Sequence, residues 1–172
     1  MEIKTIEPFL DYLARVRERT ARVIAAIPPD SIEWTYAPGR FTLGDLVRHL
    51  ASIERYMFVE NVCGRPSAYP GHGRELADGY ADVLAYFERL HAESVELLSR
   101  LSPEDLARRS TTPGGATLPA WKWLRSMVEH EIHHRGQIYI YLGLLGVEKA
   151  PPLYGLTEEE VFARSQPGGR EI

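Results

Sequence analysis

The sequence predicts an all-α protein, a four-helix bundle of antiparallel helices with long crossing connections. Four long segments place apolar residues three or four positions apart, which is the spacing of one helix face. The connections between them span roughly 10 to 17 residues and are rich in proline and glycine. No segment alternates apolar and polar residues as a half-buried strand does. We therefore expect a single domain over residues 1–172, in which 166–172 form a frayed tail.

The first predicted helix runs from Glu7 to Ala26 and ends at Pro28 and Pro29, which cannot continue it. The next stretch, Asp30–Arg40, carries two aromatic residues and a Pro-Gly pair, so it is interpreted as an ordered connection. The apolar residues of this first helix recur at amphipathic spacing and are Leu10, Leu13, Val16, Val23 and Ile27.

Thr42 and Asp45 resemble a capping box, with Asp in place of the usual Glu, and open a second helix that extends to about Val62. His49 lies on or beside the apolar stripe of this helix. The residues predicted to form the stripe are Leu43, Leu46, Leu50, Ile53 and Met57.

A loop over Gly64–Gly73 should cross one end of the bundle, where it could form part of a pocket rim. A third helix follows from about Leu76 to Leu101, and Gly79 weakens its first turn. His91 is assigned to the solvated face of this helix because glutamates flank it. The predicted buried face consists of Val83, Leu84, Phe87, Leu90, Val95 and Leu98.

Ser102, followed by Pro103, predicts a short helical turn, and Thr111–Ala116 is a break. The fourth helix is expected from about Leu118 to Leu145, with Gly146 ending it. In the tail, Thr157 and Glu160 have the spacing of a capping box and predict one further helical turn.

The composition is that of an ordinary globular protein, with 44% hydrophobic and 26% charged residues. A formal charge of -4 and the absence of a basic stripe argue against a nucleic-acid partner. No stretch approaches the length of a membrane span, and the N-terminus lacks the apolar run of a signal peptide. The one cysteine, Cys63, excludes an intramolecular disulfide. We therefore expect a cytoplasmic protein with no membrane partner.

Two histidines of the fourth helix, His130 and His134, have the spacing of metal ligands. Residues four apart differ by only about 40° around a helix axis, so both imidazoles can converge on one point. The alternative is a pair of half-buried histidines that are hydrogen-bonded to neighbours. In a bundle, His49 can be aimed at the same point from the second helix. Three neutral imidazoles with open coordination positions are typical of a catalytic divalent-metal site.

Three segments together resemble the DinB family of bundle metalloproteins: residues 46–50 around His49, the block His130–Gln137, and the ending Leu153–Thr157. The resemblance covers nearly the whole chain. It implies a four-helix bundle, often a homodimer, that holds a divalent metal through one His of the second helix and a His-x-x-x-His pair of the last. Matched onto this sequence, the metal ligands are His49, His130 and His134.

Other residues near the histidines have open roles. Asp45 or Gln137 could orient an imidazole through its second nitrogen, although Asp45 could instead be only a cap. His133 should point about 100° away from His134 and is assigned to packing or a second hydrogen bond. Residues 130–134 also match the His-Glu-x-x-His pattern of zinc proteases, with Glu131 as general base and a third ligand from residues 158–160.

The leading functional hypothesis is a metal-dependent S-transferase that activates a small thiol for attack on a small electrophile, because relatives of the DinB family include thiol-dependent transferases and isomerases. The expected cofactors are zinc or nickel and a low-molecular-weight thiol, and the expected substrate is a small molecule. Alternatives are a hydrolase of a small amide or ester, and a non-catalytic metal-binding stress-response protein. No catalytic or cofactor-binding residue is assigned, and the three histidines are assigned only as metal ligands.

Overall fold

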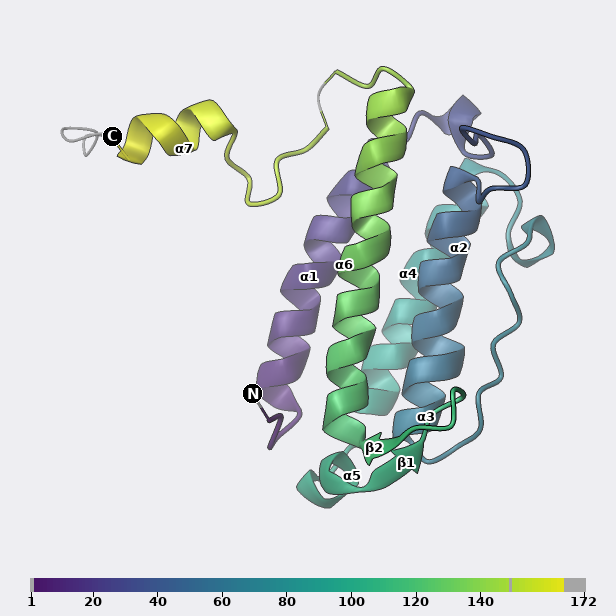
Figure 1. Ribbon diagram of the computed structural model, residues 1–172, viewed down its shortest axis with the longest axis vertical. Helices are drawn as coiled ribbons and strands as arrows, with labels where there is room; N and C mark the ends of the chain where they lie inside the picture. Colours follow the sequence, from purple (N-terminus) through teal and green to yellow (C-terminus); the bar gives the residue numbers. More distant parts are fainter. Residues whose placement is uncertain (1, 149, 166–172) are drawn as a thin grey trace.

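Four long helical segments form a bundle in the computed structural model, which describes residues 2–148 and 150–165 (Figure 1). The predicted frayed tail, 166–172, lies outside the described residues. The predicted four-helix bundle is thus confirmed. The long segments are α1 (Glu7–Ala25), the continuous run of α2 (Leu43–Ile53), η2 (Glu54–Val59) and α3 (Glu60–Val62), then α4 (Tyr80–Leu98) and α6 (Ala120–Leu144).

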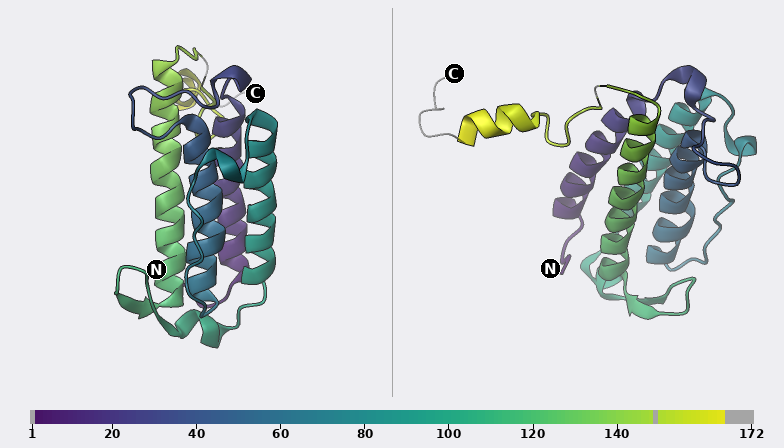
Figure 2. Two further views of the ribbon diagram at one scale, coloured as in Figure 1. Left: turned by 90° about the vertical axis from the view of Figure 1, so that its right-hand side faces the viewer. Right: turned by 45° about the horizontal axis from the view of Figure 1, so that its top comes forward.

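The helix directions follow from one long connection. In Figure 1, α1 and α6 run upward and lie side by side, whereas α2 and α4 both run downward. The two pairs are therefore antiparallel to each other, while the helices within a pair are parallel. Residues 63–79 make this arrangement possible because they return along the length of the bundle before α4 begins (Figure 2). This crossover includes one short 3-10 turn, η3 (Arg74–Leu76).

The second long segment changes its helical period in the middle. It starts at the predicted Thr42–Asp45 capping box, in which Asp45 N–H donates to Thr42 Oγ1 over 2.9 Å. From Glu54 to Val59 it is a π-helix, which holds more residues per turn than an α-helix and so shifts the buried face. Ile53 and Met57 of the predicted stripe are only partly buried, although both pack against the core. Later in this segment, the residues that are buried in the core are Phe58, Val59 and Val62.

The third helix begins at Tyr80, four residues later than the sequence predicts. Gly79 adopts φ +87°, which is outside the helical region and is accessible to glycine at little cost. Ala77 is extended, with φ −167° and ψ 124°. The start of α4 is therefore fixed by backbone conformation rather than by the apolar pattern.

The base of the bundle contains a short hairpin that the sequence analysis missed. The predicted turn at Ser102 is confirmed as α5 (Pro103–Ala107), and it is followed by β1 (Arg109–Thr111) and β2 (Thr117–Pro119). The strands pair antiparallel, with Ser110 opposite Leu118. Because each strand has only three residues, no alternation could reveal it, and α6 accordingly begins at Ala120 rather than Leu118.

Two apolar clusters fill the bundle, one toward each end. The upper cluster includes Val23, Leu46, Leu90 and Leu142, and the lower one includes Leu13, Val59, Leu98 and Leu124.

A group of ionisable residues, three of them buried and one partly buried, lies between these two clusters and joins all four long segments. Arg17 of α1 pairs with Glu54 of η2, and its Nη2 lies 3.3 Å from Oε2 of Glu131 on α6. His91 of α4 contacts Glu54 over 3.0 Å, so its assignment to a solvated face is wrong. The Arg17 guanidinium also lies 4.1 Å from the ring centroid of Phe87. We call this group, Arg17, Glu54, His91 and Glu131, the buried charge network.

The C-terminal arm leaves the bundle after α6 and ends in α7 (Glu158–Ser165), which projects away from the other helices (Figures 1 and 2). The predicted capping box is confirmed, since Glu160 N–H donates to Thr157 Oγ1 over 3.2 Å. No side chain of α7 is buried, and Phe162 is 69% exposed. Within the described part of the chain, no helix is long and apolar enough to cross a membrane.

Candidate metal centre

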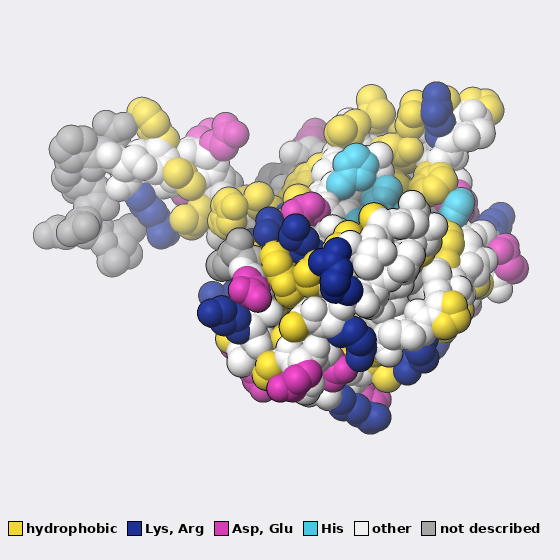
Figure 3. Space-filling view, turned by 60° about the horizontal axis from the view of Figure 1, so that its bottom comes forward, with side chains coloured by type: hydrophobic (Ala, Val, Ile, Leu, Met, Phe, Trp, Pro, Cys, Tyr) yellow, Lys and Arg dark blue, Asp and Glu magenta, His cyan; other side chains and the backbone are white. Residues whose placement is uncertain are grey.

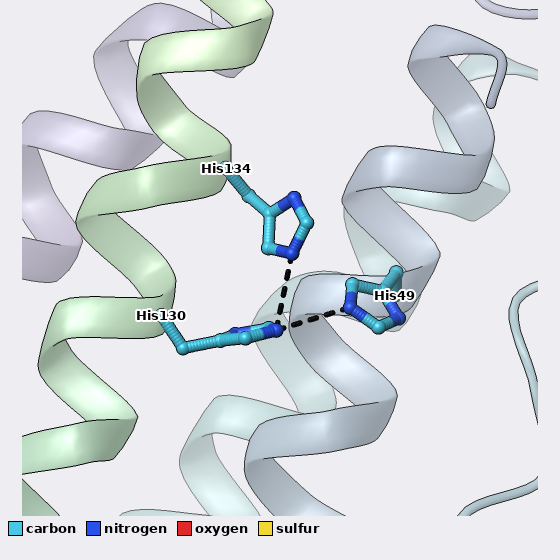
Figure 4. A group of neighbouring side chains, drawn as sticks. All are labelled: His49, His130 and His134. Carbon is cyan, nitrogen blue, oxygen red and sulfur yellow. Dashed lines mark hydrogen bonds between the residues drawn. The ribbon is translucent and has the colours of Figure 1, made fainter. Parts of the chain in front are cut away.

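The structure brings His49, His130 and His134 together between two of the long helices (Figure 4). His49 reaches in from α2, and the other two project from successive turns of α6. Nε2 of His130 lies 3.1 Å from Nε2 of His49 and 3.1 Å from Nε2 of His134. One ring nitrogen of each residue lies within 4.8 Å of the others. The convergence inferred from the sequence is therefore what the fold produces.

The three imidazoles are neutral at physiological pH. Burial lowers the pKa of His49 to about 4, and the neighbouring His134 and His72 lower it further in the same direction. Burial likewise lowers the pKa of His130 to about 3, with His134 and His49 contributing. The pKa of His134 is also lowered by burial, although the hydrogen bond with Gln137 opposes the shift. Neutral rings keep a lone pair free for a metal at pH 7.

The outer ring nitrogens of two ligands have hydrogen-bond partners. Nδ1 of His134 lies 2.6 Å from Oε1 of Gln137, which is an acceptor, so this Nδ1 carries the proton and Nε2 faces the centre unprotonated. Gln137 thus orients a ligand, as the sequence suggested. Asp45 does not: its carboxylate caps α2 and pairs with Arg48 at 2.8 Å. His49 instead contacts the hydroxyl of Tyr69, at 2.7 Å from Nδ1.

The donor set fits a divalent transition metal. Zinc binds imidazole nitrogens at about 2.0–2.1 Å, so two ligands of a tetrahedral site lie about 3.3 Å apart. The two Nε2 contacts of 3.1 Å are close to that spacing. In the part of the chain that the structure describes, the group contains three histidines and no carboxylate or thiolate. Such a set suits zinc, nickel, copper or iron, and leaves coordination positions for a further ligand.

Aromatic side chains surround the three histidines. The Phe58 ring lies 5.7 Å from that of His130 and packs on Trp123 at 4.5 Å. The Phe41 ring lies 5.6 Å from that of His49. Histidine side chains gather at one place on the surface, with hydrophobic side chains nearby (Figure 3). The ligands themselves are half-buried, so a small molecule could reach them from solvent.

Glu131 does not take part in this site, which removes the protease interpretation. It is 3% exposed and faces Arg17 in the buried charge network. The glutamates at 158–160, which would supply the third protease ligand, lie on the projecting α7. His133 is exposed and is not a ligand, as expected, and its ring lies 4.9 Å from that of His134.

Cys63 is also outside the group of ligands, at the end of α3. Burial raises the pKa of its thiol, although Arg65 opposes that shift. The chain therefore does not place a thiolate of its own at the candidate centre.

Sequence reasoning missed two residues of this region, Tyr69 and His72. Tyr69 touches His49, and its hydroxyl also lies 3.2 Å from Nδ1 of His72. Both belong to the crossover, where no helical or strand period places side chains on a face. Their only indication in the sequence is a polar aromatic pair within a loop that was expected to rim a pocket.

A protein-family model matches most of the chain. The sequence model described as the DinB superfamily matches residues 12–138, which include all three histidines. The protein YjoA of Bacillus subtilis, described as uncharacterized, is 23% identical over 137 residues, covering 78% of this chain and 87% of that protein.

Solved structures show the same fold. A DinB-like protein from Bacillus cereus ATCC 10987 superimposes with a TM-score of 0.71 at 22% identity, covering 87% of this chain and 97% of that one. The structure of Bacillus subtilis YjoA gives a TM-score of 0.65 at 21% identity, over 80% and 91% of the two chains. TT2238, described as a four-helix bundle protein, gives a TM-score of 0.61 at 22% identity, over 79% and 99%.

Proposed function

Because the chain belongs to the DinB superfamily and its bundle brings three neutral imidazoles to one point, we propose that it is a divalent-metal-dependent enzyme. The metal ligands are His49, His130 and His134. The reaction that we propose is transfer of a small thiol to a small electrophile. When bound, a divalent ion with three neutral ligands keeps its positive charge and acts as a Lewis acid that stabilises a thiolate.

The observation that carries this proposal is the composition of the site. A divalent ion held by neutral imidazoles lowers the pKa of a bound thiol and of a bound water alike, so the ion alone does not separate transfer from hydrolysis. Within the described residues, the ligand group contains no carboxylate that could act as a general base, and Glu131, next to His130 in the sequence, is directed toward Arg17. This supports thiol transfer over a hydrolysis that relies on a carboxylate general base. Since Cys63 lies outside the group, the thiol is a second substrate supplied from solution.

Metal binding is the first part of the test. Protein purified without an affinity tag should contain, or take up from added zinc or nickel, about one ion per chain by elemental analysis. Substitution of His49, His130 or His134 by alanine should abolish this metal binding. His133→Gln is the matched control, because His133 lies on the same helix between two ligands yet is exposed and outside the group. Equal metal loss in the control, or no uptake by the wild type, would contradict the site.

Turnover is the second part. Loss of free thiol in the presence of a panel of small electrophiles should require the metal and should stop when a chelator is added. Electrophile consumption without thiol would support the hydrolase instead. Metal uptake without either reaction, across the panel, would favour a non-catalytic metal-binding protein.

Homodimerisation is also a proposal, and it is supported by exposed apolar side chains on the outer face of α1 and α6. Tyr12, Ile132, Ile140 and Leu144 are each more than 40% exposed. Light scattering coupled to size exclusion should give about twice the chain mass of 19.5 kDa. Glutamate at Ile140 should return the protein to a monomer if this face forms the contact.

A further inference from the structure

His49 differs from the other two ligands in how its ring is held. His134 donates a hydrogen bond from Nδ1 to Oε1 of Gln137, three residues away on the same helix. In the described part of the chain, only His49 has a partner from a connecting segment, the hydroxyl of Tyr69 at 2.7 Å. The two rings meet edge to face, with centroids 5.7 Å apart. The orientation of this ligand therefore depends on where the crossover is placed.

Two anchors fix the crossover on either side of Tyr69. Before it, Ala68 N–H donates to the carbonyl of Tyr56, which lies in the π-helical turn η2. After it, Arg48 Nε donates to the carbonyl of His72 over 2.8 Å. Tyr69 thus lies within a stretch of five residues that is tied to the second long segment at both ends. A loop residue held in this way has far less freedom than an exposed loop normally allows.

Arg48 is a strong anchor because its side chain is buried and its guanidinium has several partners. Its side chain is fully buried, and its guanidinium pairs with Glu33 at 2.7 Å and Asp45 at 2.8 Å. A further bond reaches the carbonyl of Ala77 over 3.0 Å. Arg48 immediately precedes His49, so the residue that holds the crossover and the ligand that the crossover orients share one helical turn. Any shift of α2 moves both together.

The direction of the hydrogen bonds follows from the role of His49. If Nε2 is the ligand atom, Nδ1 carries the proton and donates to the Tyr69 oxygen. The Tyr69 hydroxyl is then free to donate to Nδ1 of His72, 3.2 Å away. His72 packs against Phe41, with centroids 4.2 Å apart, which holds its ring in place. Each donor in the hydrogen-bond series from His49 through Tyr69 to His72 therefore faces an acceptor.

We propose that the crossover is part of the metal centre: anchored through Arg48 and Tyr56, it presents Tyr69, backed by His72, as a positioning residue that fixes the His49 ring for metal binding. This inference rests on the proposed three-histidine site and adds residues to it. It predicts that metal affinity depends on a hydroxyl group carried by a loop. Residues of this kind typically contribute about 10- to 100-fold to metal affinity.

The test is a competition titration of purified full-length protein with zinc and a chromophoric chelator. Tyr69→Phe removes one oxygen and should weaken zinc binding about 10-fold. His72→Gln should weaken it less. Because His72 acts through the Tyr69 hydroxyl, the double variant should bind zinc no more weakly than Tyr69→Phe alone. The visible spectrum of the cobalt-substituted protein should change in Tyr69→Phe, since the orientation of one imidazole changes.

Tyr86→Phe is the matched control. Its hydroxyl also bonds to α2, at 2.8 Å from Ser52 Oγ, but touches no ligand. It should leave zinc affinity and the cobalt spectrum unchanged even if it lowers stability, which thermal unfolding of every variant will report. Affinity of Tyr69→Phe within twofold of wild type, while His49→Ala loses the metal, would overturn this inference and leave the proposed site intact. No zinc binding by wild type would overturn both.

Discussion

Replacing Glu54 by glutamine should strongly destabilise the protein, because the buried guanidinium of Arg17 then keeps only one of its two carboxylate partners, Glu131. Arg17 and Glu54 are 7% and 3% exposed, so solvent cannot replace the lost carboxylate. Breaking a buried pair from one side typically costs 3–5 kcal/mol. Glu131 remains 3.3 Å from Arg17 and keeps the charge partly balanced, so we expect the lower end, about 3 kcal/mol.

Urea denaturation at pH 7 measures this change. For a chain of this size, about 3 kcal/mol corresponds to a fall in Tm of roughly 6–12 °C. Glu96→Gln is the control, because the Glu96–Arg100 pair is also broken from its acidic side but both side chains are 68% exposed. The control should change the free energy of unfolding by less than about 0.5 kcal/mol. A loss below about 1 kcal/mol in Glu54→Gln would refute a stabilising role for the buried charge network.

Wild type and Glu54→Gln can also be compared as a function of pH. Burial alone would raise the pKa of Glu54, but the Arg17 guanidinium and the hydrogen bond with His91 lower it to about 2. Since this lies below the ordinary value of 4.5, the unfolded chain binds the proton more readily. The stabilisation is therefore complete above pH 4.5 and is lost as the pH falls toward 2. The stability difference between wild type and Glu54→Gln should shrink from pH 7 to pH 3, and a constant difference would contradict this pKa.

Two further predictions concern the backbone and the arm. Gly79→Ala should lower the free energy of unfolding by about 1–3 kcal/mol, because φ +87° strains any residue that has a Cβ. Gly143→Ala should raise it by up to about 1 kcal/mol, because Gly143 lies inside α6 with free space around it. Equal effects of the two substitutions in urea denaturation would argue against this explanation. A chain that ends after Leu156 should have a free energy of unfolding within about 0.5 kcal/mol of the full-length protein, because α7 buries no side chain. A loss above about 1 kcal/mol would show that α7 packs on the bundle.

The helices and the three histidines were predictable because both depend on local spacing. The i and i+4 positions of His130 and His134 determine their common face in any α-helix, and the caps at Thr42, Ser102 and Thr157 mark where helices begin. The place of His49 on or beside the apolar stripe of the second helix made it the candidate third ligand, and the resemblance to the DinB family implied the same residue. Each of these conclusions requires only residues within one helix turn, or a motif.

What could not be predicted depends on contacts between distant segments. The π-helical turn moves Phe58 and Val59 into the core, and nothing in the local sequence distinguishes it from a regular helix. His91 was interpreted from its glutamate neighbours, but its partner Glu54 lies 37 residues away. Tyr69 likewise approaches His49 only because Arg48 and Tyr56 hold the crossover against the second segment.

The buried charge network has a consequence for how metal content should be interpreted. Arg17, Glu54, His91 and Glu131 tie the four long segments together, and two apolar clusters pack on either side of them. Cohesion of this kind does not depend on an ion, in contrast to small domains that unfold when a chelator removes their zinc. Removing an ion from the three histidines should therefore leave the chain folded. Different metals can then be loaded into the same folded protein, and the one that supports function can be identified by comparing activities after reloading.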